Sequence, residues 1–163
     1  MNISPSNCWC TQRGWIFWCC LIDHGRLCGA RAFLHYPGIG TYSVMMNCGS
    51  GSNTRGELLS LWCFLYFARF LKITQLNVLG DSRIIIDWFK NFASLKVMNL
   101  ESWMVKIREL CCSFTYISIG HTYCEYNTEA DRLSKKALLA EEGKIYYIVG
   151  HGPDLVYHNY ISL

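Results

Sequence analysis

The order of the apolar segments constrains the fold of this chain more than any other feature of its sequence. Three apolar segments that we interpret as antiparallel strands come first, at residues 15–22, 26–35 and 42–47. Helices and strands then alternate, with helices predicted at residues 54–70, 82–91, 100–111 and 127–140 and strands at 74–79 and 114–120. This order predicts an α/β domain in which helices pack on a mixed sheet.

The length and composition suit one compact domain. The chain has 163 residues, of which 52% are hydrophobic, enough apolar material to bury a core. We assign residues 1–140 to this domain and residues 141–163 to a C-terminal tail. In that tail, residues 145–149 either add a strand to the sheet or run across the surface.

Three of the 12 acidic residues lie where predicted strands end or predicted helices begin. Glu57 opens the first predicted helix, Asp81 follows the fourth predicted strand, and Asp131 lies in the last predicted helix, ten residues after His121. Carboxylates are the hard anionic ligands that magnesium prefers. Three of them at such junctions indicate a magnesium site for cutting phosphodiesters.

Each acid also has an ordinary structural interpretation. Residues 54–57 fit a capping box, in which the Glu57 side chain returns to the backbone of the cap residue. Asp81 and Ser82 after a strand fit a helix N-cap, and residues 128–131 are also box-like. Taken singly, each acid is more typical of a cap, and only the combination of all three favours a metal site.

That combination resembles the ribonuclease H family in three ordered motifs. Residues 52–58, Ser-Asn-Thr-Arg-Gly-Glu-Leu, are similar to the segment that carries the second catalytic carboxylate of the family, which falls on Glu57. The step Gly-Asp-Ser at residues 80–82 is similar to the one that carries the third, on Asp81. Residues 121–137 resemble the plant, retrotransposon-derived branch, which places the flexible-loop histidine on His121 and the fourth carboxylate on Asp131.

The sequence departs from the family pattern at its beginning. The family opens with a strand that carries its first catalytic acid in an Asp-Gly-(Ser/Ala) step. Counting back from Gly14 places that acid near residues 2–4, Asn-Ile-Ser, and no apolar run precedes them. We therefore expect the first strand to be truncated or degenerate. Asp23 lies in the predicted hairpin turn at residues 23–25 and does not replace the acid, and Cys124 stands where the branch has arginine.

The resemblance implies a magnesium-dependent endonuclease that hydrolyses the RNA strand of RNA–DNA hybrids, with manganese as a possible substitute. Glu57 and Asp81 would hold the ion beside the leaving group, Asp131 would hold an ion near the attacking water, and His121 would assist proton transfer or product release. Since one carboxylate is missing, we expect impaired catalysis. Two other interpretations remain open, a non-catalytic nucleic-acid-binding remnant and a protein-interaction module.

The nucleic-acid contacts implied by the resemblance are small polar residues and one arginine: Ser52, Asn53, Arg55 and Asn127. Such groups read the 2′-hydroxyls of RNA, although each also fits an ordinary turn or cap role. The implied partner is an RNA–DNA hybrid or a double-stranded RNA or DNA, and the net charge of +3 permits it. For Trp88, packing in the core is favoured over stacking on a sugar.

The remaining features concern cysteines and location. The chain has ten cysteines, which we interpret as buried free thiols in a reducing compartment because they lie in apolar runs and no signal peptide is visible. The longest notable apolar stretch, residues 15–22, is too short to span a membrane, which takes about 20 residues. We therefore expect a nuclear or cytoplasmic protein, and the sequence does not indicate its oligomeric state.

Overall fold

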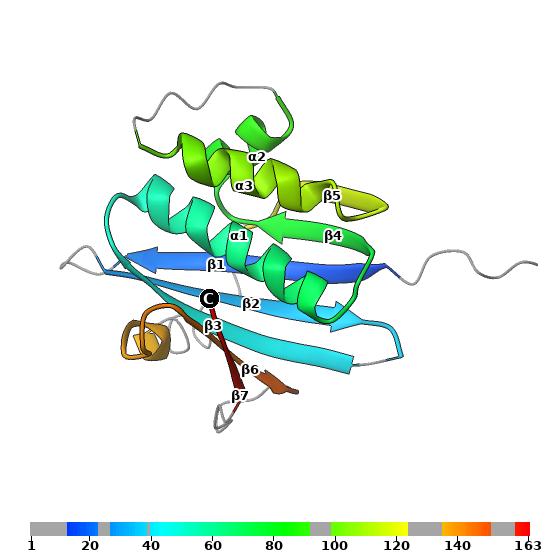
Figure 1. The fold of residues 1–163 in the computed structure, drawn as a ribbon, viewed down its shortest axis with the longest axis horizontal. Helices are drawn as coiled ribbons and strands as arrows, with labels where there is room; N and C mark the ends of the chain where they lie inside the picture. The colour runs from blue at the N-terminus through cyan, green and yellow to red at the C-terminus, as the bar shows by residue number, and fades with distance from the viewer. Residues whose placement is uncertain (1–12, 23–26, 39, 92–98, 124–134, 151–158) are drawn as a thin grey trace, which may run out of the picture.

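A computed structural model describes residues 13–22, 27–38, 40–91, 99–123, 135–150 and 159–163. One sheet of seven strands carries three helices on one of its faces (Figure 1). In chain order the elements are β1 (Gly14–Ile22), β2 (Leu27–Tyr36), β3 (Gly40–Ser50), α1 (Asn53–Phe70), β4 (Gln75–Gly80), α2 (Arg83–Phe89), α3 (Glu101–Cys111), β5 (Tyr116–His121), β6 (Lys144–Val149) and β7 (Asn159–Ser162).

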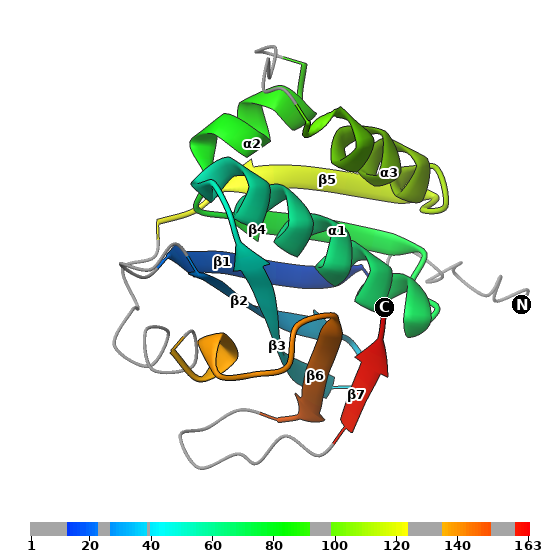
Figure 2. The same cartoon turned by 60° about the vertical axis from the view of Figure 1, so that its left-hand side comes forward.

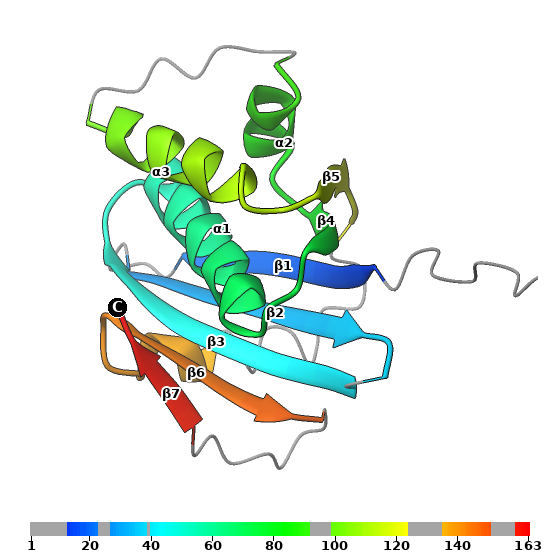
Figure 3. The same ribbon diagram turned by 45° about the vertical axis from the view of Figure 1, so that its right-hand side comes forward.

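The sheet is mixed, as the order of the segments predicted. Its strand order is β5-β4-β1-β2-β3-β6-β7. β1, β2 and β3 pair antiparallel, whereas β4 runs parallel to β1 and β5 runs parallel to β4. The carboxyl ends of β1, β4 and β5 therefore lie along one edge of the domain, close to the first residues of α1 (Figure 3).

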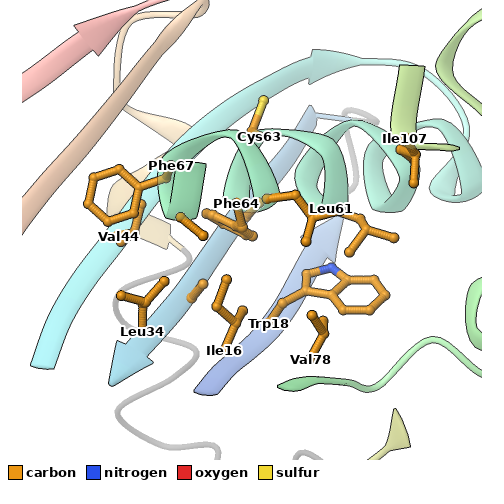
Figure 4. Close-up of a cluster of buried hydrophobic side chains, with 14 of the residues drawn as sticks. Ile16, Trp18, Leu34, Val44, Leu61, Cys63, Phe64, Phe67, Val78 and Ile107 are labelled. Atoms are coloured by element: carbon orange, nitrogen blue, oxygen red, sulfur yellow. The ribbon is translucent and has the colours of Figure 1, made fainter. Parts of the chain in front are cut away.

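The core lies between α1 and the sheet. Trp18, Phe64 and Phe67 are among the largest fully buried side chains, and they fill the layer between α1 and the central strands (Figure 4). Burying apolar side chains of this size stabilises the fold by about 1.5–3 kcal/mol each. α3 packs against α1 through Ile107, which is fully buried, and through the edge-to-face contact of Trp62 with Trp103.

Most predicted elements agree with the structure to within a few residues. The strand at residues 42–47 is longer than predicted, because Gly49 and Ser50 of the expected turn belong to β3. Trp88 is 6% exposed, which confirms its packing in the core. The expected hairpin turn at residues 23–25 and the first half of the expected last helix lie outside the described residues. Of that helix, residues 135–138 are described and are helical.

The C-terminal tail belongs to the sheet. β6 pairs with β3, and β7 pairs with β6 at the outer edge (Figure 2). The strand interpretation of residues 145–149 is thereby confirmed, whereas β7 was not predicted. Its alternating pattern covers only four residues, too few for a periodicity to be read from the sequence.

β1 fills the place in the sheet where we expected the first strand to be missing. β1 lies at the centre of the sheet, between β4 and β2, and three antiparallel strands precede α1. Among the described residues the sheet therefore has no gap left by a truncated first strand, because residues 14–22, which had been counted as the second strand, fill this position. That the first strand is degenerate stays a prediction. Residues 2–4, where the first acid was sought, lie outside the described part of the chain.

The expectation of free cysteines is confirmed in part. Cys48, Cys63, Cys111 and Cys112 are free thiols, and burial raises the pKa of Cys48 to about 12, which keeps this thiol protonated and unreactive. Cys28 is disulfide-bonded, so the expectation is wrong for this residue. Spacing along a sequence does not show which cysteines the fold brings within bonding distance.

Candidate functional site

The pairing of β1 with β4, and of β4 with β5, ends at one edge of the sheet, next to Asp81. Trp18 of β1 pairs with Gly80 of β4, which in turn pairs with His121 of β5. Asp81 follows Gly80 directly. In open α/β sheets, the carboxyl ends of parallel strands are where ligands bind, so the predicted site lies where the architecture favours one.

Glu57 reaches this edge from the first turns of α1. The helix begins at Ser52, the N-cap, whose hydroxyl accepts a hydrogen bond from the backbone N–H of Arg55 at 3.2 Å. The half-buried carboxylate of Glu57 accepts a hydrogen bond from the hydroxyl of Ser82 instead of returning to the cap. The capping-box interpretation of Glu57 is therefore wrong.

Ser82 occupies the N-cap position of α2 without capping that helix. Its side chain makes no capping hydrogen bond, and its hydroxyl is committed to Glu57. Ser82 is 7% exposed, so this hydrogen bond is largely shielded from water. Asp81, one residue earlier, is not the cap either. Asp81 lies close enough to Glu57 for its charge to act on the Glu57 carboxyl.

The electrostatics of the pair confirm that the two acids are close. Burial raises the pKa of the Glu57 carboxyl above its ordinary value, and the negative charge of Asp81 raises it further. Hydrogen bonds from Ser82 and Asn53 act in the opposite direction by stabilising the charged form. A cation placed between two such carboxylates would relieve their repulsion.

The donor set is incomplete within the described residues. No three histidine, cysteine, aspartate or glutamate side chains of this part of the chain come together as a metal site. Asp131, the third predicted ligand, lies outside it. The carboxylates of Glu57 and Asp81 fit a hard cation such as Mg²⁺, for which they would be two of six oxygen ligands.

β1 has buried Trp18 at the position where its neighbour β4 leads into an acid. Trp18 is 1% exposed, and its indole N–H donates to the hydroxyl of Ser60 at 3.0 Å. That hydroxyl in turn donates to the backbone carbonyl of Glu57 at 2.8 Å. The Trp18 ring also lies so close to Gly80 that a Cβ there would overlap it. Trp18 thus fixes the start of α1 over the strand ends.

His121 lies on a strand beside the one that leads into Asp81. It is the last residue of β5, in register with Gly80, so its placement on a mobile loop is corrected. Its half-buried ring makes an edge-to-face contact with Tyr123, the two centroids 4.8 Å apart. The strand places the imidazole one residue from Asp81 across the β4–β5 pair.

The predicted nucleic-acid contacts cluster at the start of α1, except for Asn127, which lies outside the described residues. Ser52 and Asn53 are exposed there. The guanidinium of Arg55 donates to the carbonyl oxygens of Cys48 at 2.9 Å and of Ser50 at 3.1 Å. Arg55 therefore ties the end of β3 to α1, in addition to any contact with a ligand.

Two residues of the site were missed by sequence reasoning. Ser82 was treated as a possible cap, and nothing local indicated that its hydroxyl would reach a carboxylate 25 residues earlier. Trp18 was counted only as part of an apolar strand. Its hydrogen bond to Ser60 depends on how α1 crosses the sheet, which no local pattern encodes.

Comparison with known proteins decides the family. The family model described as reverse transcriptase-like matches residues 39–137, more than half of the chain. The chain belongs to the reverse transcriptase-like family. No curated protein sequence matches it significantly.

Solved structures show that this reverse transcriptase-like chain has a ribonuclease H fold. RNase H1 from the halophilic archaeon Halobacterium salinarum is similar with a TM-score of 0.69 and 21% identity, over 77% of this chain and 97% of that one. The N-terminal RNase H domain of a Mycobacterium tuberculosis protein gives 0.68 and 21%, over 78% and 94%. LC11-RNase H1, solved in complex with an RNA/DNA hybrid, gives 0.68 and 17%, over 77% and 96%.

Proposed function

We propose that this protein is a ribonuclease H-type domain that binds RNA–DNA hybrids, or other duplexes that contain RNA, at the edge formed by Glu57, Asp81 and His121. The observation that carries the proposal is the pairing of Glu57 with Asp81 at the carboxyl ends of parallel strands. The family match and the fold of proteins such as LC11-RNase H1 support it.

Glu57, Asp81 and Asp131 are the proposed ligands of Mg²⁺ or Mn²⁺. When bound, such an ion would neutralise charge on the leaving oxygen of a phosphodiester. Glu57 is held for this role by Ser82, and His121 would exchange a proton with water or product from the neighbouring strand. Ser52, Asn53, Arg55 and Asn127 would contact the RNA strand, with Ser52 and Asn53 exposed to do so.

Catalysis should be impaired because β1 contributes no carboxylate. We infer that β1 is the strand that bears the first acid in a ribonuclease H, since it lies beside β4 and ends next to Asp81. The residues at this end of β1, from 18 to 22, are Trp-Cys-Cys-Leu-Ile. Without a further acid from β1, beside Glu57, Asp81 and Asp131, the site should hold one ion well instead of two. We propose a retrotransposon-derived, plant-type domain of the nucleus or cytoplasm. None of the described helices is both long and apolar enough to cross a membrane.

A calorimetric titration with Mn²⁺ and Mg²⁺ tests the ion site. We expect weak binding of one ion by the parent protein, lost in Asp81→Asn, because two carboxylates repel each other less once a cation lies between them. Asp87→Asn is the matched control, since Asp87 lies on α2 in an ion pair with Arg83, 3.3 Å away. Equal binding by Asp81→Asn and the parent would refute the proposed site.

A non-catalytic domain that only binds nucleic acid is the second candidate. The apolar end of β1 favours it, since binding needs the polar residues at the start of α1 but not a complete metal site. In this case a labelled hybrid should bind with an affinity that falls with added salt, and Asn53→Ala should weaken binding. A parent protein that does not bind the hybrid would exclude both candidates and favour a protein-interaction module.

A further inference from the structure

The sheet has a second face, which points away from α1. Residues that are in register on neighbouring strands share a face, and faces alternate along each strand. Ile16 and Trp18 of β1 pack against α1, so Trp15 lies on the opposite face. The residues paired with Trp15, Asn77 of β4 and His35 of β2, lie on that same face. We call it the outer face.

Cations on the outer face lie over aromatic rings. Three such pairs are spread from one edge of the sheet to the other: the Arg13 guanidinium is 3.7 Å from the Tyr116 ring centroid, that of Arg31 is 5.0 Å from Phe33, and Lys144 Nζ is 4.4 Å from Tyr160. Each ring is attached to a strand, which fixes its position. Arg13 and Arg31 add positive potential beside their rings, whereas the charge of Lys144 is paired with the Glu141 carboxylate 2.7 Å away.

Trp15 stands between these pairs and is open to solvent. Its side chain is 41% exposed, which is unusual for a tryptophan on a central strand. Beside it, the His35 imidazole is hydrogen-bonded to the Thr41 hydroxyl at 2.9 Å, and the Ser118 hydroxyl donates to Asn77 at 2.7 Å. A row of paired residues therefore crosses five strands and places an exposed aromatic ring among side chains that donate and accept hydrogen bonds. The row consists of Ser118, Asn77, Trp15, His35 and Thr41.

Carboxylates are absent from the strands that form this face. None of the seven described strands contains an aspartate or a glutamate. The strands carry Arg31, His35 and Lys144, and Arg13 directly precedes β1. Of the described strand residues, those that can be charged at neutral pH are therefore cationic. The whole chain has a net charge of only +3, so the strands are more cationic than the protein as a whole.

Fixed aromatic rings with interspersed cations fit single-stranded nucleic acid at the end of the outer face where Trp15 is exposed. Farther along this face, the Asn47 amide donates to the carbonyl oxygens of Leu138 and Ala140, so the chain covers the face there. Unpaired bases stack on aromatic side chains, and the phosphates between them are bound by arginine and lysine. A duplex keeps its bases stacked inside and cannot use Trp15 in this way. An apolar protein partner would leave the Arg13 charge without compensation on burial.

We propose that the outer face binds single-stranded RNA or DNA, with bases stacked on Trp15 and phosphates held by Arg13 and its neighbouring cations. The distance from β5 to β2 is three strand spacings, about 14 Å, which is room for a few nucleotides. This surface is separate from the edge where Glu57 and Asp81 meet, and the inference does not depend on the proposed function.

Fluorescence anisotropy with labelled oligo(dT) and oligo(U) of about ten nucleotides tests the proposal. Trp15→Leu keeps an apolar side chain but removes the ring, and it should weaken binding at least about fivefold, whereas Trp15→Phe should stay within about twofold. The matched control is Ile84→Leu on α2, since Ile84 is 60% exposed and lies away from this face. Added salt should weaken binding by the parent.

Three results would overturn the proposal: no binding by the parent at low salt, equal binding by Trp15→Leu and the parent, or a concentration-dependent dimer that Trp15→Leu abolishes. Circular dichroism of Trp15→Leu shows whether the variant is folded, and Arg13→Gln provides a second test of the same surface. Asp81→Asn and Asn53→Ala should leave oligonucleotide binding unchanged. Loss of hybrid binding alone would therefore count against the proposed function and not against the outer face.

Discussion

β1 and β4 run parallel as neighbours in the sheet, but they lead into different chemistry. β4 leads into Asp81, whose charge raises the pKa of Glu57. β1 has buried Trp18 beside the last residue of β4 and continues through Cys19 and Cys20 to Ile22. The backbone arrangement of the two strands is that of solved RNase H1 proteins. Packing therefore preserves the frame of the site, while single residues at the strand ends decide what the frame can do.

We expect the largest loss of stability from changes to the contact between Trp18 of β1 and Gly80 of β4. Trp18→Ala should lower the free energy of unfolding by about 3–5 kcal/mol, because it leaves a cavity and breaks the hydrogen bond to Ser60. Gly80→Ala should cost about 1–3 kcal/mol, since its Cβ would overlap the Trp18 ring. Urea denaturation measures both changes. Trp15→Ala on the outer face is the control. If it lowers the free energy of unfolding as much as Trp18→Ala does, the contacts of Trp18 are not central to stability.

The contrast between the two strands also shows what sequence alone could predict. The order of apolar segments predicted the mixed sheet, because periodicity and turn residues are local signals. It did not reveal that residues 14–22 take the central position, since strand order depends on long-range pairing. Glu57, Asp81 and His121, which the three motifs singled out, lie toward one edge of the sheet, and their roles stay predictions. The route by which Ser82 and Trp18 support the start of α1 appears only once α1 crosses the sheet.

Ser82 provides the next test of the β4 end. Ser82→Ala should weaken Mn²⁺ binding about tenfold, because partners of ligating carboxylates orient them and typically contribute 10–100-fold in affinity. Ser82→Thr keeps the hydroxyl and should bind the ion nearly as well as the parent. Calorimetry gives the affinities. If Ser82→Ala and Ser82→Thr bind equally, the hydrogen bond to Glu57 does not position the ligand.

Glu57 gives a smaller, pH-dependent effect on stability. Its pKa is raised in the folded state, so the unfolded protein releases this proton more readily. Stability is therefore lost as pH rises from the ordinary glutamate pKa through the raised one. Glu57→Gln should raise Tm by about 1–3 °C at neutral pH and leave it unchanged below pH 4. Differential scanning calorimetry without metal ions measures this. An equal shift at both pH values would show that the charge is not the cause.

Cleavage of a labelled RNA–DNA hybrid with Mg²⁺ compares the two strand ends most directly. Trp18 is in register with Gly80, so Cys19 continues β1 opposite Asp81, and both Cys19→Asp and Cys20→Asp are made to restore an acid there. The account predicts slow cleavage by the parent and a rate at least about tenfold higher in one of these variants, lost again when Asp81→Asn is added. Rapid cleavage by the parent that Asp81→Asn abolishes would contradict it, because another residue would then complete the site.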